Sequence, residues 1–219
     1  MALGILYFTR CRISNDAVPP PAPTPEDSAG PAKIALVYDD VGYGHRKTLE
    51  RALRIKAKQT FAVIPFSERD LFFSKVIRAS DGEVLLHLPL PSEEPHPKQK
   101  YPGGVEMKDS AKTVEEKIGK DLDRVPGALG LNNHQGSLGT ADERLMGLVL
   151  GAIKRRGLFF LDSRTTPATK AKVLAAKRGA RFAERSVFLD NKDDPKEIRE
   201  QLARLVRRAR KNGEAVGIG

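Results

Sequence analysis

Short apolar runs alternate with amphipathic stretches from residue 33 onward. Most of these runs are unbroken, which is typical of parallel strands buried on both faces. They are Ile34–Tyr38, Phe61–Pro65, Val84–Leu88, Ala128–Leu131, Leu158–Leu161, Val187–Leu189 and Ala215–Ile218. Seven such strands alternating with helical segments predict an α/β fold with a parallel sheet, open or closed into a barrel.

Helix start and stop signals separate the runs. Helix starts are predicted at the capping box Thr140 to Glu143, and at Thr166–Pro167 and Asp194–Pro195 as N-cap and first helical position. Glycines typical of helix C-termini are Gly157, Gly179 and Gly213. The predicted helix ends therefore agree with the predicted strands.

The first 32 residues differ from the rest in composition. Residues 13–32 contain six prolines among small and polar residues, which indicates an extended, disordered linker. The apolar run of residues 2–8 is followed rather than preceded by Arg10 and Arg12, so it is not a complete signal peptide. We expect a proline-rich arm over 1–32 and one domain over 33–219.

The net charge and the composition of the chain indicate which classes of binding partner to expect. The formal net charge is +10 and the pI is about 9.8, which favours anionic partners such as nucleic acid, acidic lipid or anionic glycan. Aromatic residues make up only 6%, tryptophan is absent and no nucleic-acid module is recognisable, so we expect no nucleic-acid partner. Much of the excess charge lies on one helix-like stretch, interpreted as a solvated face: Arg204, Arg207, Arg208, Arg210 and Lys211.

Polar residues recur where these strands end. They are Asp39 and Asp40, His87, Asn132 to His134, Asp162 to Arg164, and Asp190 with Asn191. A single Asp-Asp pair is often a turn, and a single histidine in an apolar run is often a core residue. The carboxyl ends of parallel barrel strands meet at one mouth, however, so recurrence at five strands favours a functional site.

The residue types at this mouth suit a metal. One aspartate and two histidines are a common catalytic zinc set that leaves a position open for water. A second carboxylate next to the ligand can accept the proton of that water. The adjacent pair of aspartates fits this division, one binding the metal and the other acting as base.

Five segments resemble the divergent polysaccharide deacetylase family, a branch of the NodB-type carbohydrate esterases. They are Ile34–Gly44, Glu83–Leu90, Val125–Ser137, Gly157–Thr166 and Val187–Asn191. The resemblance extends over residues 33–219. It implies a distorted (β/α)7 barrel and a divalent metal cofactor, with zinc expected.

The resemblance also assigns roles. It implies Asp39 as the base, Asp40 as a metal ligand with His87 and His134, Arg164 as the partner that orients Asp39, and Asp162 and Asp190 as further members of the catalytic group. Asn132, Asn133, Ser137 and Ser163 are expected to bind substrate. In the wider family both metal histidines come from one motif after the third strand. His134 would come instead from the next strand.

The sequence also departs from the family at its last strand. The family usually continues there with Gly-His-Pro-His and a helix, whereas this sequence stops at Gly219. We therefore expect strand Ala215–Ile218 to pair in the sheet, and the closing helix and a catalytic histidine to be missing.

The functional expectation is a metal-dependent hydrolase that removes acetyl groups from a cell-envelope polysaccharide or peptidoglycan-type glycan. The alternative is a non-catalytic envelope barrel that binds glycan or protein. Hydrolysis of another substrate and nucleic-acid binding are weaker alternatives. Family members commonly carry an export or anchor segment before a proline-rich linker, so we expect a cell-envelope or periplasmic location, with membrane association possible through such a segment.

Overall fold

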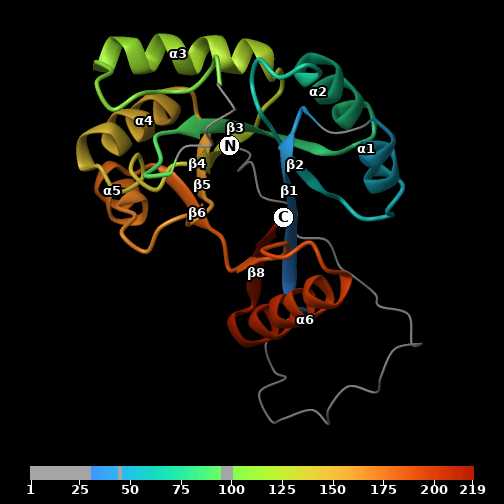
Figure 1. Cartoon of the computed structure of the whole chain (residues 1–219). Helices are drawn as coiled ribbons and strands as arrows, with labels where there is room; N and C mark the ends of the chain where they lie inside the picture. The colour runs from blue at the N-terminus through green and yellow to red at the C-terminus, as the bar shows by residue number, and fades with distance from the viewer. Residues whose placement is uncertain (1–30, 44–45, 95–100) are drawn as a thin grey trace.

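The computed structural model describes residues 31–43, 46–94 and 101–219. Strands and helices alternate along this part of the chain (Figure 1). The strands are β1 Lys33–Val41, β2 Thr60–Val63, β3 Glu83–Leu90, β4 Gly130–Gln135, β5 Phe159–Asp162, β6 Arg181–Glu184, β7 Val187–Phe188 and β8 Glu214–Ile218. The helices are α1 Arg46–Leu53, α2 Asp70–Ala79, α3 Ala111–Arg124, α4 Glu143–Arg155, α5 Ala171–Arg178 and α6 Pro195–Asn212. Residues 1–30, which include most of the predicted linker, lie outside the described residues.

All eight strands form one parallel sheet in the order β6-β5-β4-β3-β2-β1-β8-β7. The sheet curls into a half-barrel with helices around its outside (Figure 1). Its two edges, β6 and β7, are joined directly through Arg185 and Ser186, and we call the opening between these edges the seam. The predicted distorted α/β barrel is confirmed, and β8 pairs with β1 and β7 as expected.

One strand was not predicted. β6, with the sequence Arg-Phe-Ala-Glu, contains only two apolar residues, so it shows no apolar run. It pairs with β5 along one side and forms an edge of the sheet. β4 also differs from the prediction, because it continues through Asn132, Asn133 and His134. These polar side chains are therefore held inside a strand rather than in the turn that follows it.

Two helix starts differ from the prediction. Asp142, not Thr140, caps α4 and accepts a hydrogen bond from the backbone of Leu145, while the Thr140 hydroxyl donates to the carbonyl of Gly136. α5 begins at Ala171, not at Pro167, because Thr166 is used in a local turn with Ala168. The prediction for α6 is confirmed: the Asp194 side chain accepts from two backbone amides.

The core lies on both faces of the sheet. The larger apolar cluster fills the space between the sheet and the helices α2 to α5, and all eight residues of β3 are buried. A smaller cluster fills the inside of the barrel: Ala35, Val37, Ala62, Leu85, Phe159, Leu161, Val216 and Ile218. This packing on two faces explains why the strands are continuous apolar runs. Among the described residues, no helix has the length and apolarity needed to cross a bilayer.

Candidate metal centre

Three predicted ligands meet at the mouth of the half-barrel. Ligand atoms of Asp40, His87 and His134 all lie within 4.8 Å of one another. The Oδ1 atom of Asp40 is 2.7 Å from Nδ1 of His134 and 3.0 Å from Nε2 of His87. The predicted convergence is confirmed, and the metal itself stays a prediction.

Strand pairing and one backbone irregularity produce this convergence. β3 and β4 are neighbours, with His87 opposite Asn132 and Pro89 opposite His134. On β1, Asp40 has a φ of 52°, and the register with β2 shifts between Tyr38 and Val41. Successive side chains of a regular strand point to opposite faces. The left-handed conformation, which aspartate tolerates better than most residues, breaks that alternation and turns Asp40 toward the histidines.

Both histidine rings are fixed at the nitrogen that points away from the centre. Nδ1 of His87 lies 2.9 Å from Oδ1 of Asn132, and Nε2 of His134 lies 2.5 Å from the hydroxyl of Tyr101. The inward nitrogens of the two rings are only 3.2 Å apart. Outer partners of this kind are typical of metal-ligating histidines, because they fix the tautomer and the ring orientation. Two facing nitrogens beside a carboxylate also favour a shared cation, so the residues fit a metal.

The two aspartates have opposite electrostatic character. Burial raises the pKa of Asp39 to about 6, and the neighbouring charges of Asp40 and Asp190 act in the same direction against the opposing effect of His87. Burial also acts to raise the pKa of Asp40, but hydrogen bonds with His134 and His87 overcome it and hold the pKa well below its usual range. Asp40 is therefore ionised, while Asp39 can exchange a proton near neutral pH.

Tyr101 is a member of the centre that the sequence did not reveal. Burial and the charge of Asp40 raise its pKa to about 12, so the hydroxyl stays protonated. Its loop is anchored nearby, since the backbone amide of Gly104 donates to the buried carboxylate of Asp121 on α3 at 2.8 Å. No local pattern around Tyr101 marks it, because only the folded loop after β3 brings it to His134.

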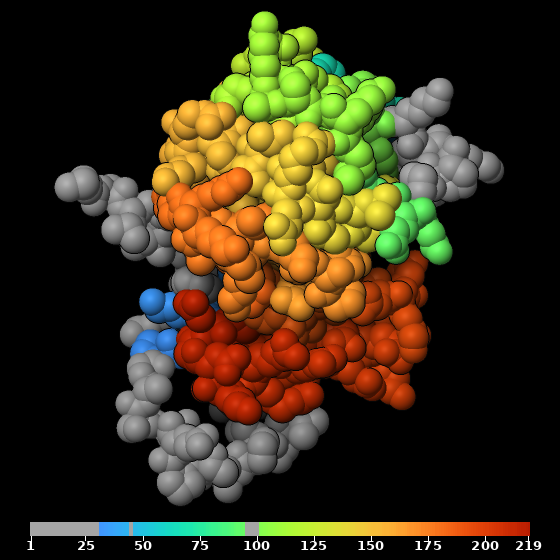
Figure 2. Space-filling model, turned by 90° about the vertical axis from the view of Figure 1, so that its left-hand side faces the viewer, coloured from blue at the N-terminus to red at the C-terminus, as the bar shows by residue number. Residues whose placement is uncertain are grey.

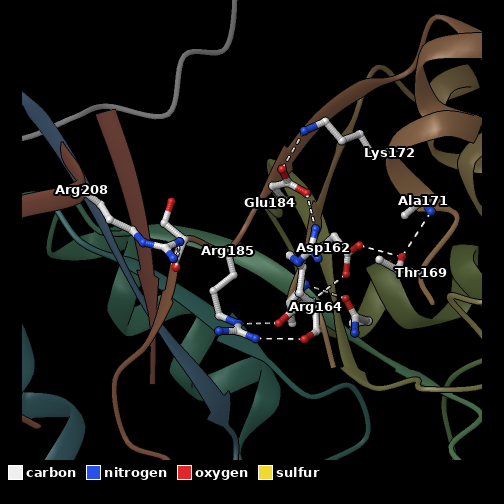
Figure 3. A network of polar contacts seen from close by, with 11 residues as sticks. Asp162, Arg164, Thr169, Ala171, Lys172, Glu184, Arg185 and Arg208 are labelled. Atoms are coloured by element: carbon white, nitrogen blue, oxygen red, sulfur yellow. Dashed lines mark hydrogen bonds and ion pairs between the residues drawn. The ribbon is translucent and has the colours of Figure 1, made fainter. Parts of the chain in front are cut away.

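The expected pairing of Arg164 with Asp39 is wrong. The guanidinium of Arg164 pairs with Glu184 at 2.9 Å, and Glu184 also binds Lys172 (Figure 3). The arginine that acts electrostatically on Asp39 is Arg185, which follows β6. The sequence gives no sign of this role, because β6 has no apolar run that would predict a strand before Arg185.

Asp162 organises the loop after β5 rather than the reaction centre. Its carboxylate accepts from the backbone amide of Arg164 and from the hydroxyl of Thr169, each at 2.7 Å. Figure 3 shows these contacts, and Asp162 is fully buried. Its expected catalytic role is therefore replaced by a structural one. Asp190 lies close enough to Asp39 to raise its pKa, which keeps Asp190 in the candidate site.

Three of the four expected substrate-binding residues are buried supports. Asn132, Asn133 and Ser163 are at most 2% exposed. Asn132 donates to the Ser163 hydroxyl at 3.2 Å, and the Ser163 amide donates to Asn133 at 2.8 Å. These bonds tie β4 to β5 and position His87 through Asn132, so direct contact with a glycan is excluded by burial.

Ser137, the fourth of these residues, is half-buried. Its hydroxyl contacts that of Ser92 at 3.1 Å and accepts from the amide of Glu93 at 2.9 Å. It joins the loops that follow β3 and β4. A contact with substrate stays a prediction for Ser137.

Comparisons with known proteins agree with this architecture. An uncharacterised protein of Haemophilus influenzae is 32% identical over 86% of this chain, and the uncharacterised Escherichia coli protein YibQ is 35% identical over 85%. The chain spans 66% and 58% of the lengths of these two relatives. A crystal structure of the uncharacterised Agrobacterium tumefaciens protein ATU2773 matches with a TM-score of 0.77 at 23% identity, covering 86% of this chain and 76% of that one, and so shares the fold.

A family model settles the classification. The model of the divergent polysaccharide deacetylases matches residues 36–219, which include Asp40, His87 and His134. The chain belongs to the divergent polysaccharide deacetylase family.

Proposed function

We propose that this protein is a metal-dependent hydrolase that removes acetyl groups from a cell-envelope polysaccharide or a peptidoglycan-type glycan. The convergence of Asp40, His87 and His134, with both rings oriented from outside, is the observation that supports the proposal. Membership of the deacetylase family supports the substrate class. The envelope location expected from the sequence is part of the same proposal.

The donor set favours zinc. One carboxylate oxygen and two imidazole nitrogens are common catalytic zinc ligands, and three protein ligands leave a position open. A divalent ion held by these residues would polarise the acetyl carbonyl and lower the pKa of a water molecule. Asn132 and Tyr101 would keep the two rings in the orientation that this binding needs.

Asp39 is the residue proposed to take up the proton of the attacking water. It directly precedes Asp40 on β1, and its pKa of about 6 allows it to be ionised at neutral pH and to release a proton afterwards. Burial makes its protonated form accessible, and the charge of Asp190 acts in the same direction. These properties suit a general base.

The alternative is a non-catalytic barrel that binds glycan or protein. One observation favours it: the histidines among the described residues, His87 and His134, both face the centre. Neither is left as an acid to protonate the leaving amine or alcohol. Asp39 would have to return its own proton, or turnover would be slow.

Metal content and acetate release together test the proposal. We expect purified wild-type protein to carry about one zinc per chain and to release acetate from acetylated chitooligosaccharides or peptidoglycan. His134→Ala should lose the metal and the activity. Asp39→Asn should keep the metal and lose about 10²–10⁴-fold in rate, the usual contribution of general acid–base catalysis.

Two results would count against the proposal. If wild-type protein supplied with zinc carries no bound metal, the proposal that Asp40, His87 and His134 bind a metal is wrong. Stoichiometric metal without acetate release from either substrate would favour the binding alternative.

A further inference from the structure

A polar hollow of about 400 Å³ lies at the seam, outside the metal centre. It is bordered by the loop after β5, the end of β6, and α6. Six of its lining residues matter here: Arg164, Glu184, Arg185, Gln201, Arg204 and Arg208. Figure 2 shows this side of the molecule, with the orange α5 region above the red α6. Four arginines and one carboxylate give the hollow an excess of positive charge.

The single carboxylate is already neutralised. Glu184 binds Arg164 at 2.9 Å and Lys172 at 2.7 Å. Among the described residues, the other three arginines have no carboxylate partner: Arg185, Arg204 and Arg208. Figure 3 shows Arg185 between Arg208 on one side and the chain of Arg164, Glu184 and Lys172 on the other. The positive charge of the hollow is therefore available to a ligand.

The arginines are held in place by the backbone of the seam. Arg185 donates to the carbonyls of Ser163 and Arg164 at 2.6 and 2.9 Å, and its guanidinium lies 4.8 Å from the centre of the Phe188 ring. Arg208 donates to the carbonyl of Ser186 at 2.6 Å. Burial, together with the charges of Arg164 and Arg208, lowers the pKa of Arg185 against the opposing effect of Asp162 and Asp39.

Two of these charges lie close together on helix α6. Arg204 and Arg208 are four residues apart, so they lie on the same face of the helix, where like charges repel. Arg207, Arg210 and Lys211 of the same basic stretch do not line the hollow. The stretch is thus divided between a solvated face and a face that concentrates charge at the seam.

The hollow is connected to the metal centre by hydrogen bonds. Arg185 donates to the Ser163 carbonyl, the Ser163 hydroxyl accepts from Asn132, and Asn132 contacts His87. Arg185 also acts electrostatically on Asp39. A ligand group bound at the seam would therefore lie beside the mouth.

We infer that the seam hollow binds a carboxylate of the glycan, so that the preferred substrate is an acidic glycan rather than a neutral one. The inference rests on the proposed function, because it names the substrate class for the same mouth. Arginine suits this role, since its planar fork binds carboxylates through paired hydrogen bonds.

Two tetrasaccharides of equal length test the inference by calorimetric titration. One is neutral chitotetraose, and the other alternates N-acetylglucosamine with N-acetylmuramic acid and so adds lactyl carboxylates. We expect the acidic sugar to bind about tenfold more tightly or better, as charge-assisted hydrogen bonds provide, with the preference falling as salt is raised. Arg204→Gln and Arg208→Gln should reduce the preference while leaving affinity for chitotetraose unchanged.

Arg207→Gln is the matched control, because it removes the same charge from α6 outside the hollow. It should keep the preference, and thermal denaturation should show that all three variants are folded. Equal affinity of wild-type protein for the two sugars overturns the inference, and so does an equal loss in Arg207→Gln. Inorganic phosphate that binds in an Arg204-dependent manner, without any preference between the sugars, overturns the assignment to a glycan.

The titration needs no turnover, so the two proposals can fail separately. Acetate release without a preference for the acidic sugar would retain the deacetylase and reject the seam site. A preference for the acidic sugar without acetate release would retain the seam site and reject the deacetylase.

Discussion

The strands that carry the metal centre and the strands that border the seam are built differently. Every residue of β3 is buried, and β3 pairs with β2 over Glu83–Leu86 and with β4 over Leu85–Leu90. β6 has no fully buried residue, and β7 is only two residues long. The packing around β3 keeps the three candidate ligand atoms within 4.8 Å of one another. The sparse seam instead leaves arginine side chains beside solvent, where the proposed glycan carboxylate could reach them.

The largest expected effect of this contrast is on stability. Leu86 in β3 is fully buried, whereas Leu202 on α6 is 37% exposed. Leu86→Ala should lower the free energy of unfolding by about 2–5 kcal/mol, because it leaves a cavity in a packed core. Leu202→Ala should change it by about 0.5 kcal/mol or less. Urea denaturation of both variants checks the difference, and equal losses would show that the seam is packed as tightly as the centre.

The two regions should also respond to pH with opposite sign. Burial raises the pKa of Asp121 to about 6, so the folded state holds its proton more tightly than the unfolded chain and stability falls as pH rises from about 4 through 6. Burial opposes ionisation of Glu184 too, but hydrogen bonds with Lys172 and Arg164 lower its pKa below the ordinary value. Glu184 therefore stabilises the folded state at pH values above the ordinary pKa of a glutamate, and this stabilisation is lost as pH falls through its lowered pKa.

Substitutions separate these two contributions. Asp121→Asn should remove a penalty of roughly 1–3 kcal/mol at pH 7.5 and leave stability near pH 4 little changed. Glu184→Gln should destabilise the protein at pH 7.5 and have no effect at low pH. Unfolding free energies measured across pH test both variants, and parallel curves for the two would contradict the assignment.

The last prediction concerns the support of His87. Asn132→Ala removes the partner of its outer nitrogen and should weaken zinc affinity about 10–100-fold, the usual result of losing such a partner. Asn212→Ala, the same change at the end of α6, should leave affinity as in wild type. Competition with a zinc chelator measures both. An unchanged affinity in Asn132→Ala would mean that strand packing alone orients His87.

The sequence predicted the centre better than its surroundings. Asp40, His87 and His134 could be found because parallel strands bring their carboxyl ends together, whatever their separation along the chain. Tyr101 and Arg185 could not, since each reaches the mouth through a loop or edge strand without an apolar pattern. Asn132 and Ser163 were recognised as important, but only the structure shows that they are buried and serve His87.

The fold shows the same division. Long buried strands such as β3 can be predicted because they are apolar runs. β6 has no such run, and it is recognised as a strand only from its pairing with β5. Thr140 and Asp142 are both capable N-caps, and the choice between them is made by the Thr140 hydroxyl, which is used by the preceding turn. Tertiary contacts decide such cases, so local sequence cannot.

The pairing of β1 with β8 has a consequence for how the protein is made. Lys33 lies opposite Glu214, and the amide of Asp39 bonds to the carbonyl of Gly219. During synthesis, β1 is the first of the described strands to emerge, and the edge that pairs with β8 stays unpaired until β8 has been translated. Such distant parallel pairing is slow, and a waiting apolar strand is prone to aggregate. The strand that carries Asp39 and Asp40 therefore gains its second neighbour only after the other described strands have been made, so the candidate site is assembled late in synthesis.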